Sequence, residues 1–264
     1  MTRLLSLVAV LAALPVAAQE ADLGGWTLPE GAVVTSTSLV TMRGNVVGPG
    51  GEVTFQDQHS ETLETTIDGV EGGRLVRAVQ RVEASEAKTF IGGARTPVEP
   101  DPLLGRTVVT RRDGEGWQRE PVGWRPSEAA QNALDEPVTL DDAEYPERPV
   151  AVGETVRVDA ETIHRVYLNA TPGDHALTVT LDSLGTFEGG PAAFLSQEVS
   201  VTVDLGEGTM EMDMTARIVR RLDWKIDVWT VWEGPVVIDF GEARIEGTMR
   251  FEGTQEVTLP SPGG

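Results

Sequence analysis

Long stretches of this chain alternate between apolar and polar side chains. In residues 195–205 most odd-numbered positions are apolar and the even-numbered ones are polar, and residues 177–182 repeat the pattern. Successive side chains of a β-strand point to opposite faces, so the alternation predicts antiparallel strands with one buried and one wet face. Two further long runs, residues 31–47 and 52–68, are separated by the turn-forming residues 48–51, and we expect them to form a hairpin.

The centre of the chain, residues 105–158, has a different pattern. Residues 106–112 and 117–122 flank an Asp-Gly pair, which predicts two short strands joined by a tight turn. Residues 127–134 begin with a serine and continue with good helix formers, which predicts one short helix. Several prolines follow, so we expect an extended connector before β structure resumes at residues 154–158.

These elements predict an all-β protein, built from long antiparallel strands in one or two curved sheets, as a half-open barrel or a sandwich, with one short helix. Residues 89–104 contain several glycines and prolines and are expected to form a loop. Composition does not decide between one domain and two. We expect a signal peptide in residues 1–18, a first β half in residues 19–104, and a central hairpin with a helix and connector in residues 105–158. A second β half is expected in residues 159–259 and a disordered tail in residues 260–264.

The first 18 residues have the layout of a cleavable secretory signal. Arg3 precedes an apolar run, and small residues follow up to Ala18. The apolar run is too short to span a membrane comfortably, and no later segment approaches about 18 continuous apolar residues. We therefore expect an exported protein, periplasmic or extracellular, without a transmembrane segment.

Charge and composition narrow the classes of function. With 42 acidic and 21 basic residues the formal net charge is −21, which repels nucleic acid and anionic membranes, so a nucleic-acid partner is not expected. The chain has no cysteine, which excludes disulfides, thiolate metal sites and a cysteine nucleophile. The sequence also lacks a nucleophile elbow, a His-Glu-x-x-His motif, a phosphate-binding loop and an EF-hand loop. We expect neither a cofactor nor a metal ion.

One polar cluster interrupts a predicted buried face. Asp57, His59 and Glu61 share parity in an otherwise largely apolar row of residues 52–68. Two carboxylates and an imidazole at this spacing can converge on a cation or a polar ligand. The alternative is a solvated face, because three residues on one strand lack the ligands from a second strand that a metal site needs.

A second candidate site is apolar and lies in the second β half. Its proposed wall consists of Met210, Met212, Met214, Trp224 and Trp232. The two tryptophans share parity, so a continuous strand would place them on the same face. Methionine adapts to irregular partners and tryptophan supplies broad contact area, so these side chains predict a cavity for a lipid, an acyl chain or an apolar peptide. The loop at residues 89–104 is expected to gate it. The alternative is that these side chains form ordinary core.

The segment 149–156 reads Pro-Val-Ala-Val-Gly-Glu-Thr-Val. It resembles the Val-Gly-Glu-x-(aromatic) strand of uncharacterised secreted bacterial β-proteins, in which a hairpin, a short helix and a Pro-rich link lead to that strand. The resemblance covers residues 105–158, and Val156 stands at the position of the aromatic. Long strands curling around a central helix also resemble the half-open barrel of periplasmic lipoprotein carriers and related lipid-binding proteins. Neither resemblance assigns a functional residue.

The sequence thus predicts an exported, non-catalytic binding protein of the bacterial envelope, with a lipid or acyl chain as the expected type of ligand. A carboxylate-dependent hydrolase acting on envelope sugars and a structural partner of an envelope complex remain alternatives. Two facing carboxylates about 5–10 Å apart in a concave pocket would favour the hydrolase. An open apolar trough would favour a carrier, and a closed core with a flat apolar patch would favour a structural partner.

Overall fold

The structure is a computed structural model that describes residues 19–261, except for 115, 137, 139, 141–144, 168–169 and 172–174. The expected signal peptide and the last three residues of the expected tail lie outside the described residues. Strands make up 65% of the structure, the described strands all pair in the antiparallel direction, and the sheet remains open. The predicted all-β class is confirmed. No helix in the described part of the chain is long and apolar enough to cross a membrane.

Twelve strands form the main sheet. In the first half of the chain these are β2 (Val33–Gly48), β3 (Gly51–Glu71), β4 (Arg74–Ile91), β5 (Ala94–Thr96), β6 (Thr107–Asp113) and β7 (Gly116–Pro121). In the second half they are β9 (Thr155–Arg157), β10 (Ala176–Phe187), β11 (Gly190–Asp204), β12 (Thr209–Arg221), β13 (Ile226–Asp239) and β14 (Arg244–Thr258). A separate small sheet pairs β1 (Glu20–Ala21) with β8 (Val150–Ala151).

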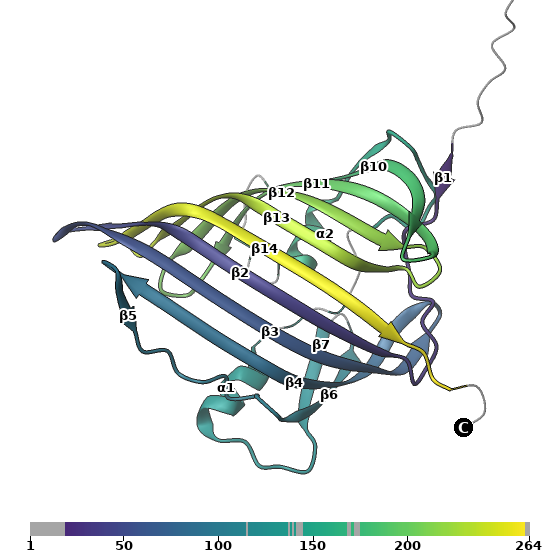
Figure 1. The fold of residues 1–264 in the computed structure, drawn as a ribbon, viewed down its shortest axis with the longest axis horizontal. Coiled ribbons are helices and arrows are strands. Elements are labelled where there is room, and N and C mark those ends of the chain that lie inside the picture. The colour runs from purple at the N-terminus through teal and green to yellow at the C-terminus, as the bar shows by residue number, and fades with distance from the viewer. Residues whose placement is uncertain are drawn as a thin grey trace, which may run out of the picture.

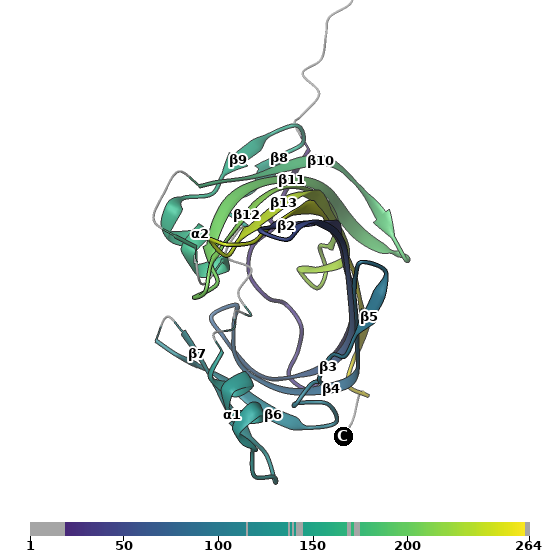
Figure 2. The ribbon, with the colours of Figure 1, turned by 90° about the vertical axis from the view of Figure 1, so that its left-hand side faces the viewer.

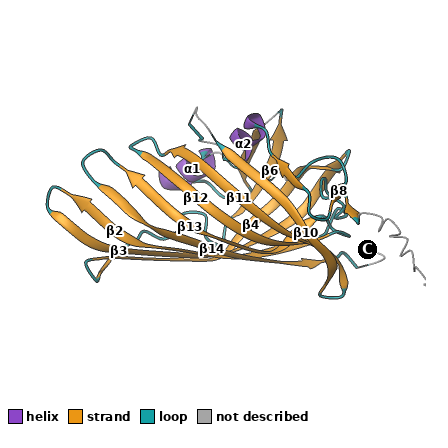
Figure 3. Ribbon diagram, turned by 90° about the horizontal axis from the view of Figure 1, so that it is seen from above, coloured by secondary structure: helices purple, strands orange, loops and turns teal. Residues whose placement is uncertain are grey.

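The order across the main sheet is β7-β6-β4-β3-β2-β14-β13-β12-β11-β10-β9, with β5 paired to β4. The two β halves are joined at the centre, where β2 pairs along Val33–Val47 with the whole of β14 (Figure 1). Figure 2 shows the sheet curled into an incomplete ring, with residues 22–32 passing through the space that it partly encloses. Figures 2 and 3 place both helices at the open side of this ring.

Glycines on neighbouring strands permit close contact where the long strands curl. Gly44 of β2 pairs directly with Gly247 of β14. A Cβ atom on Gly44 would lie 2.1 Å from the carbonyl oxygen of Glu246, and one on Gly247 would lie 2.2 Å from that of Arg43. Gly234 on β13 is under the same constraint, at 2.0 Å from the carbonyl oxygen of Asp213. Glycine in a strand commonly marks such a close approach or bend of the backbone.

The buried apolar residues form two clusters. The first lies on the inner faces of β10 to β13 and includes Leu23 and Tyr145, together with Ile163 of the helix α2 (Ala160–Val166). The second cluster contains Leu28. It brings buried residues near one end of β2, β3 and β4 together with residues beside the turn between β12 and β13. Residues before β2 therefore contribute to both clusters, which fixes this N-terminal segment inside the curled sheet.

A buried polar network holds the same segment in place. The side chain of Arg220 on β12 is fully buried, and its Nη1 donates to Oδ1 of Asp227 at 2.7 Å. Its Nε donates to the carbonyl oxygen of Leu23 at 2.8 Å. The Tyr145 hydroxyl donates to Oδ2 of Asp227 at 2.8 Å, and the Arg220 guanidinium carbon lies 4.1 Å from the centroid of the Tyr145 ring. The network connects β12, β13, the N-terminal segment and the connector.

The predicted helix is confirmed as α1 (Glu128–Asp135), which begins after Ser127, whose hydroxyl accepts a hydrogen bond from the amide of Ala130 at 3.3 Å. The prediction of a single helix is wrong, because α2 is also present. Its N-terminal cap is Asp159, whose carboxylate accepts from the amide of Thr162 at 2.9 Å. An aspartate in this position satisfies one of the free amides of a first helical turn.

Two details of the predicted elements are wrong. Residues 89–104 do not form one loop, because β4 continues to Ile91 and β5 pairs back onto it across Gly92 and Gly93. Both glycines have positive φ angles, as a two-residue hairpin turn requires. Trp224 does not continue a strand in register with Trp232, because residues 222–225 form a turn.

One buried amide interrupts the apolar inner face of β11. Gln197 is 2% exposed, and its Nε2 has no hydrogen-bond partner in the described structure. A buried donor left unpaired costs about 1–3 kcal/mol. We therefore expect Gln197→Met, which nearly preserves volume, to raise the free energy of unfolding by about 1 kcal/mol in urea denaturation. Exposed Ser200→Ala on β11 is the control, and a destabilised Gln197→Met variant would contradict the prediction.

Candidate functional site

The inner face of the sheet changes from buried to half-exposed toward its centre. On β14, exposed and half-buried residues alternate along the whole strand. The outward-facing positions are all charged residues or threonines: Arg244, Glu246, Thr248, Arg250, Glu252, Thr254, Glu256 and Thr258. The inward-facing positions are mostly apolar or glycine: Ile245, Gly247, Met249, Phe251, Gly253, Gln255 and Val257. An apolar face that is only half buried is therefore directed into the curl.

Five inward-facing side chains define what we call the inner apolar strip: Val40, Met42, Trp232, Met249 and Phe251. Phe251 is paired across the sheet with Trp232 on one side and Val40 on the other, and Met249 is paired with Met42. Residues directly opposite each other in antiparallel strands share a face, so the five side chains are contiguous. All five are half-buried, and Met42, Trp232 and Met249 also pack against the first core cluster.

The predicted polar cluster borders this strip. His59 is paired with Val40, and Asp57 is paired with Met42, so both lie on the inner face. Asp57 accepts a hydrogen bond from the Thr89 hydroxyl at 2.5 Å. Burial raises the pKa of Glu61, with a further contribution from the nearby charge of Asp101, while His59 opposes the shift. Within the described residues, no group of three or more His, Asp and Glu side chains is placed to hold a metal ion.

The predicted apolar wall is only partly brought together. Met212 and Met214 are buried in the first cluster, and Met210 and Trp232 pack against it. Trp224 packs instead against the second cluster. The guanidinium carbon of Arg221 lies over its ring, 3.9 Å from the ring centroid. Trp232 is the member of the predicted wall that also belongs to the inner apolar strip. Val40, Met42, Met249 and Phe251 were not selected from the sequence, although their alternation was visible.

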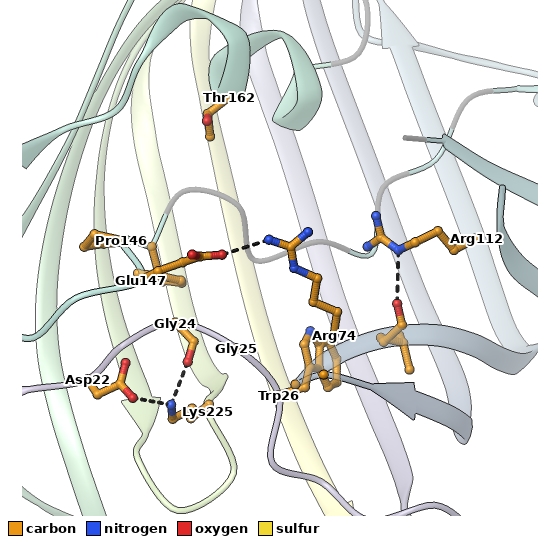
Figure 4. A pocket seen from close by; sticks show the side chains of 14 residues that line it. Asp22, Gly24, Gly25, Trp26, Arg74, Arg112, Pro146, Glu147, Thr162 and Lys225 are labelled. Carbon is orange, nitrogen blue, oxygen red and sulfur yellow. Dashed lines mark hydrogen bonds and ion pairs between the residues drawn. The ribbon is translucent and has the colours of Figure 1, made fainter. Parts of the chain in front are cut away.

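A charged pocket of about 580 Å³ lies at the end of the curled sheet near the turns that follow β3 and β12. Among the described residues, three cations line it: Arg74, Arg112 and Lys225 (Figure 4). Nη2 of Arg74 lies 2.8 Å from Oε1 of Glu147, and Nζ of Lys225 lies 2.6 Å from Oδ2 of Asp22. Sequence analysis missed this pocket, because its residues come from turns and strand ends without any shared motif.

The backbone also shapes the charged pocket. Lys225 donates to the carbonyl oxygen of Gly24 at 2.7 Å, and the Trp26 amide donates to that of Gly73 at 2.8 Å. Arg112 donates through Nε to the carbonyl oxygen of Leu75 at 3.3 Å. The N-terminal segment is thus attached to the turns on both sides of the pocket, so the pocket exists only when this segment is docked.

A second, smaller pocket of about 270 Å³ lies deeper in the curl. Its lining includes inward-facing residues of β2, β3 and β14: Val34, Ser36, Leu63, Thr65 and Gln255. Trp26 and Leu75 line both pockets and therefore lie at their boundary. The smaller pocket combines aliphatic and uncharged polar side chains with one carboxylate, that of Asp227, which already binds Arg220 and Tyr145.

Comparison with known proteins assigns no family to the chain. No protein-family model and no curated protein matches it. A solved structure, described as DynF from the dynemicin biosynthesis pathway of Micromonospora chersina, is similar at 11% sequence identity over 99% of this chain and 95% of that one, with a TM-score of 0.23. A likeness at that TM-score carries no argument about function.

Proposed function

We propose that this protein is an exported binding protein that holds an apolar ligand, such as a lipid or an acyl chain, against the concave face of its sheet. The observation that carries the proposal is the inner apolar strip. Its five side chains are half-exposed on the inner face, whereas the outer face of the same β14 is charged and polar. Burying the exposed remainder of such side chains is favourable by about 25 cal/mol per Å².

Several further features support binding of an apolar chain. The strip adjoins the first core cluster, so a ligand there would extend an apolar surface that the protein already has. Met42 and Met249 adapt to irregular shapes, and Trp232 and Phe251 provide broad contact. Export is supported by the secretory layout of residues 1–18.

The experiment is a calorimetric titration of the protein with 1-decanol, which has no charge. We expect Phe251→Asp to weaken decanol binding at least about tenfold, because a carboxylate in the strip must lose hydration when the chain binds. Thr248→Asp is the matched control, since it adds the same charge to the outer face of the same strand, and it should bind as the unaltered protein does. Extraction of the protein from its host into organic solvent, followed by mass spectrometry, should identify a co-purifying lipid.

Two results would contradict the proposal. If the unaltered protein takes up no decanol, the concave face is not an apolar binding surface. If Phe251→Asp and Thr248→Asp bind decanol equally well, any apolar site lies away from the strip. Circular dichroism of both variants verifies that the sheet is retained.

A further inference from the structure

Exposed apolar side chains gather on four turns at one end of the sheet. These turns join β2 to β3, β4 to β5, β11 to β12 and β13 to β14, and Figures 1 and 3 show them toward the left-hand end of the molecule. Five of the ten large apolar side chains that are exposed in the described residues lie there. We call these five the apolar rim: Val47, Val53, Ile91, Leu205 and Phe240.

Neighbouring turns touch one another, which makes the rim one patch. A Cβ atom on Gly208 would lie 3.0 Å from Cδ1 of Phe240, so the phenylalanine ring lies against the turn between β11 and β12. A Cβ atom on Gly48, at the end of β2, would lie 3.6 Å from the carbonyl oxygen of Glu242 in the turn between β13 and β14. Apolar residues scattered singly over a surface need no explanation, whereas a contiguous patch marks an interaction site.

Two of the four turns share one local structure. Residues 204–208 read Asp-Leu-Gly-Glu-Gly and residues 239–243 read Asp-Phe-Gly-Glu-Ala. In each turn the aspartate carboxylate accepts a hydrogen bond from the glycine amide, at 2.7 and 2.6 Å, and the glycine has a φ angle of 80° or 81°. Polar residues and glycine dominate turns, yet both of these turns present a large apolar side chain at the second position. Leu205 and Phe240 are 42% and 43% exposed.

The rim is continuous with the inner face of the sheet. A Cβ atom on Gly92 would lie 3.3 Å from Cγ1 of Val53, and Val53 is paired with inward-facing Val46. The row of directly paired residues that contains Val53 is apolar across six strands: Val53, Val46, Ile245, Ile238, Met210 and Val203.

The same two central strands connect this row to the inner apolar strip. On β2 the inward-facing residue between Met42 and Val46 is Gly44, and on β14 the one between Met249 and Ile245 is Gly247. Residues two apart on a strand share a face, so no charged side chain interrupts the inner face of β2 and β14 between the strip and the rim.

The charges of the rim favour a particular kind of lipid surface. Glu52, Glu207 and Glu242 are exposed in or beside three of the turns, and none of them forms an ion pair within the described part of the chain. Carboxylates are attracted to the ammonium groups of choline and ethanolamine head groups and are repelled by anionic lipid. Apolar side chains on separate turns can enter the boundary between head groups and acyl chains, without the shape complementarity that a protein partner requires.

We propose that the apolar rim docks on a bilayer of zwitterionic lipid, with Leu205 and Phe240 inserted between the head groups, so that the apolar ligand reaches the concave face at this end. The route of the ligand rests on the proposed function, whereas docking does not. A second copy of the chain and a protein partner are the alternative occupants of the rim.

The test is flotation of the protein with phosphatidylcholine vesicles in a density gradient. We expect the unaltered protein to float with the vesicles, and to do so less when phosphatidylglycerol is included. Phe240→Asp should weaken the partition at least about tenfold, because a charged side chain replaces an inserted apolar one. Leu205→Asp, in the matching turn, should have the same effect.

Leu259→Asp is the matched control, because Leu259 is 50% exposed and follows β14 at the end opposite to Phe240. It should float as the unaltered protein does, and circular dichroism verifies the fold of all three variants. Failure of the unaltered protein to bind vesicles would overturn docking, as would equal binding by Phe240→Asp, Leu205→Asp and Leu259→Asp. A dimer in analytical ultracentrifugation that Phe240→Asp dissociates, without vesicle binding, would assign the rim to a second copy, and a monomer without vesicle binding would leave it to a protein partner.

The decanol titration separates this inference from the proposed function. A protein that takes up decanol but does not float with vesicles retains the apolar site and loses the docking surface. A protein that floats with vesicles but takes up no decanol retains docking and loses the proposed function.

Discussion

Asp227→Ala should destabilise the protein by about 3–5 kcal/mol, because it removes the carboxylate that the fully buried guanidinium of Arg220 binds at 2.7 Å. Arg220 is fully buried, and Asp227 binds both Arg220 and the Tyr145 hydroxyl. The substitution therefore removes one partner from each of two buried or half-buried donors. The free energy of unfolding, from urea denaturation followed by circular dichroism, is the quantity to measure.

Glu233→Ala provides the comparison, since Glu233 lies on the same strand and pairs with Arg250 at 2.5 Å, but with side chains that are 60% and 49% exposed. That variant should lose less than about 1 kcal/mol. Replacing both partners, as Arg220→Met with Asp227→Leu, should recover part of the loss, because the buried guanidinium is then removed together with the carboxylate that it binds. Equal destabilisation by Asp227→Ala and Glu233→Ala would contradict the structural role assigned to the network.

The same network links folding to the charged pocket. Arg220 binds the carbonyl oxygen of Leu23, which directly precedes the pocket-lining residues Gly24, Gly25 and Trp26. Weakening the network should therefore release the N-terminal segment before it unfolds the sheet.

The sequence predicted the strands because their information is local. Period-two alternation is present along β10, β11 and β12 without reference to any other part of the chain. The capping serine and the helix formers after it likewise predicted α1. The pairing of β2 with β14 was not predicted, because nothing local in either strand identifies a partner about 200 residues away.

The candidate sites were harder to predict for the same reason. Parity connected Trp224 to Trp232 only under the assumption of a continuous strand, and a turn with a positive φ angle at Lys225 breaks that assumption. The charged pocket depends on contacts such as Lys225 with Asp22, which are 203 positions apart. The inner apolar strip consists of alternating residues on three strands, and only their order in the sheet makes them contiguous.

Glycine in a β segment can be mistaken for a break in the strand. Gly247 lies within β14, which runs through it without interruption. Its pairing with Gly44 shows why glycine is required there: each residue lies where the backbone of the partner strand occupies the position of a Cβ atom. The glycines permit the curl of the sheet and therefore the concave face.

Gly247→Ala should consequently destabilise the protein by about 3 kcal/mol, since the new methyl group would lie 2.2 Å from the carbonyl oxygen of Arg43 and the paired strands would have to separate. Gly50→Ala is the matched control, because a Cβ atom there meets nothing within 4 Å, and its unfolding free energy should change by less than about 0.5 kcal/mol. Since Gly247 lies between Ile245 and Met249 on the inner face, the strained variant should also bind decanol more weakly, at a temperature where it remains folded. A Gly247→Ala protein with the stability of the Gly50→Ala control would show that β2 and β14 are not so closely paired, and would remove the glycine contacts as the cause of the curl.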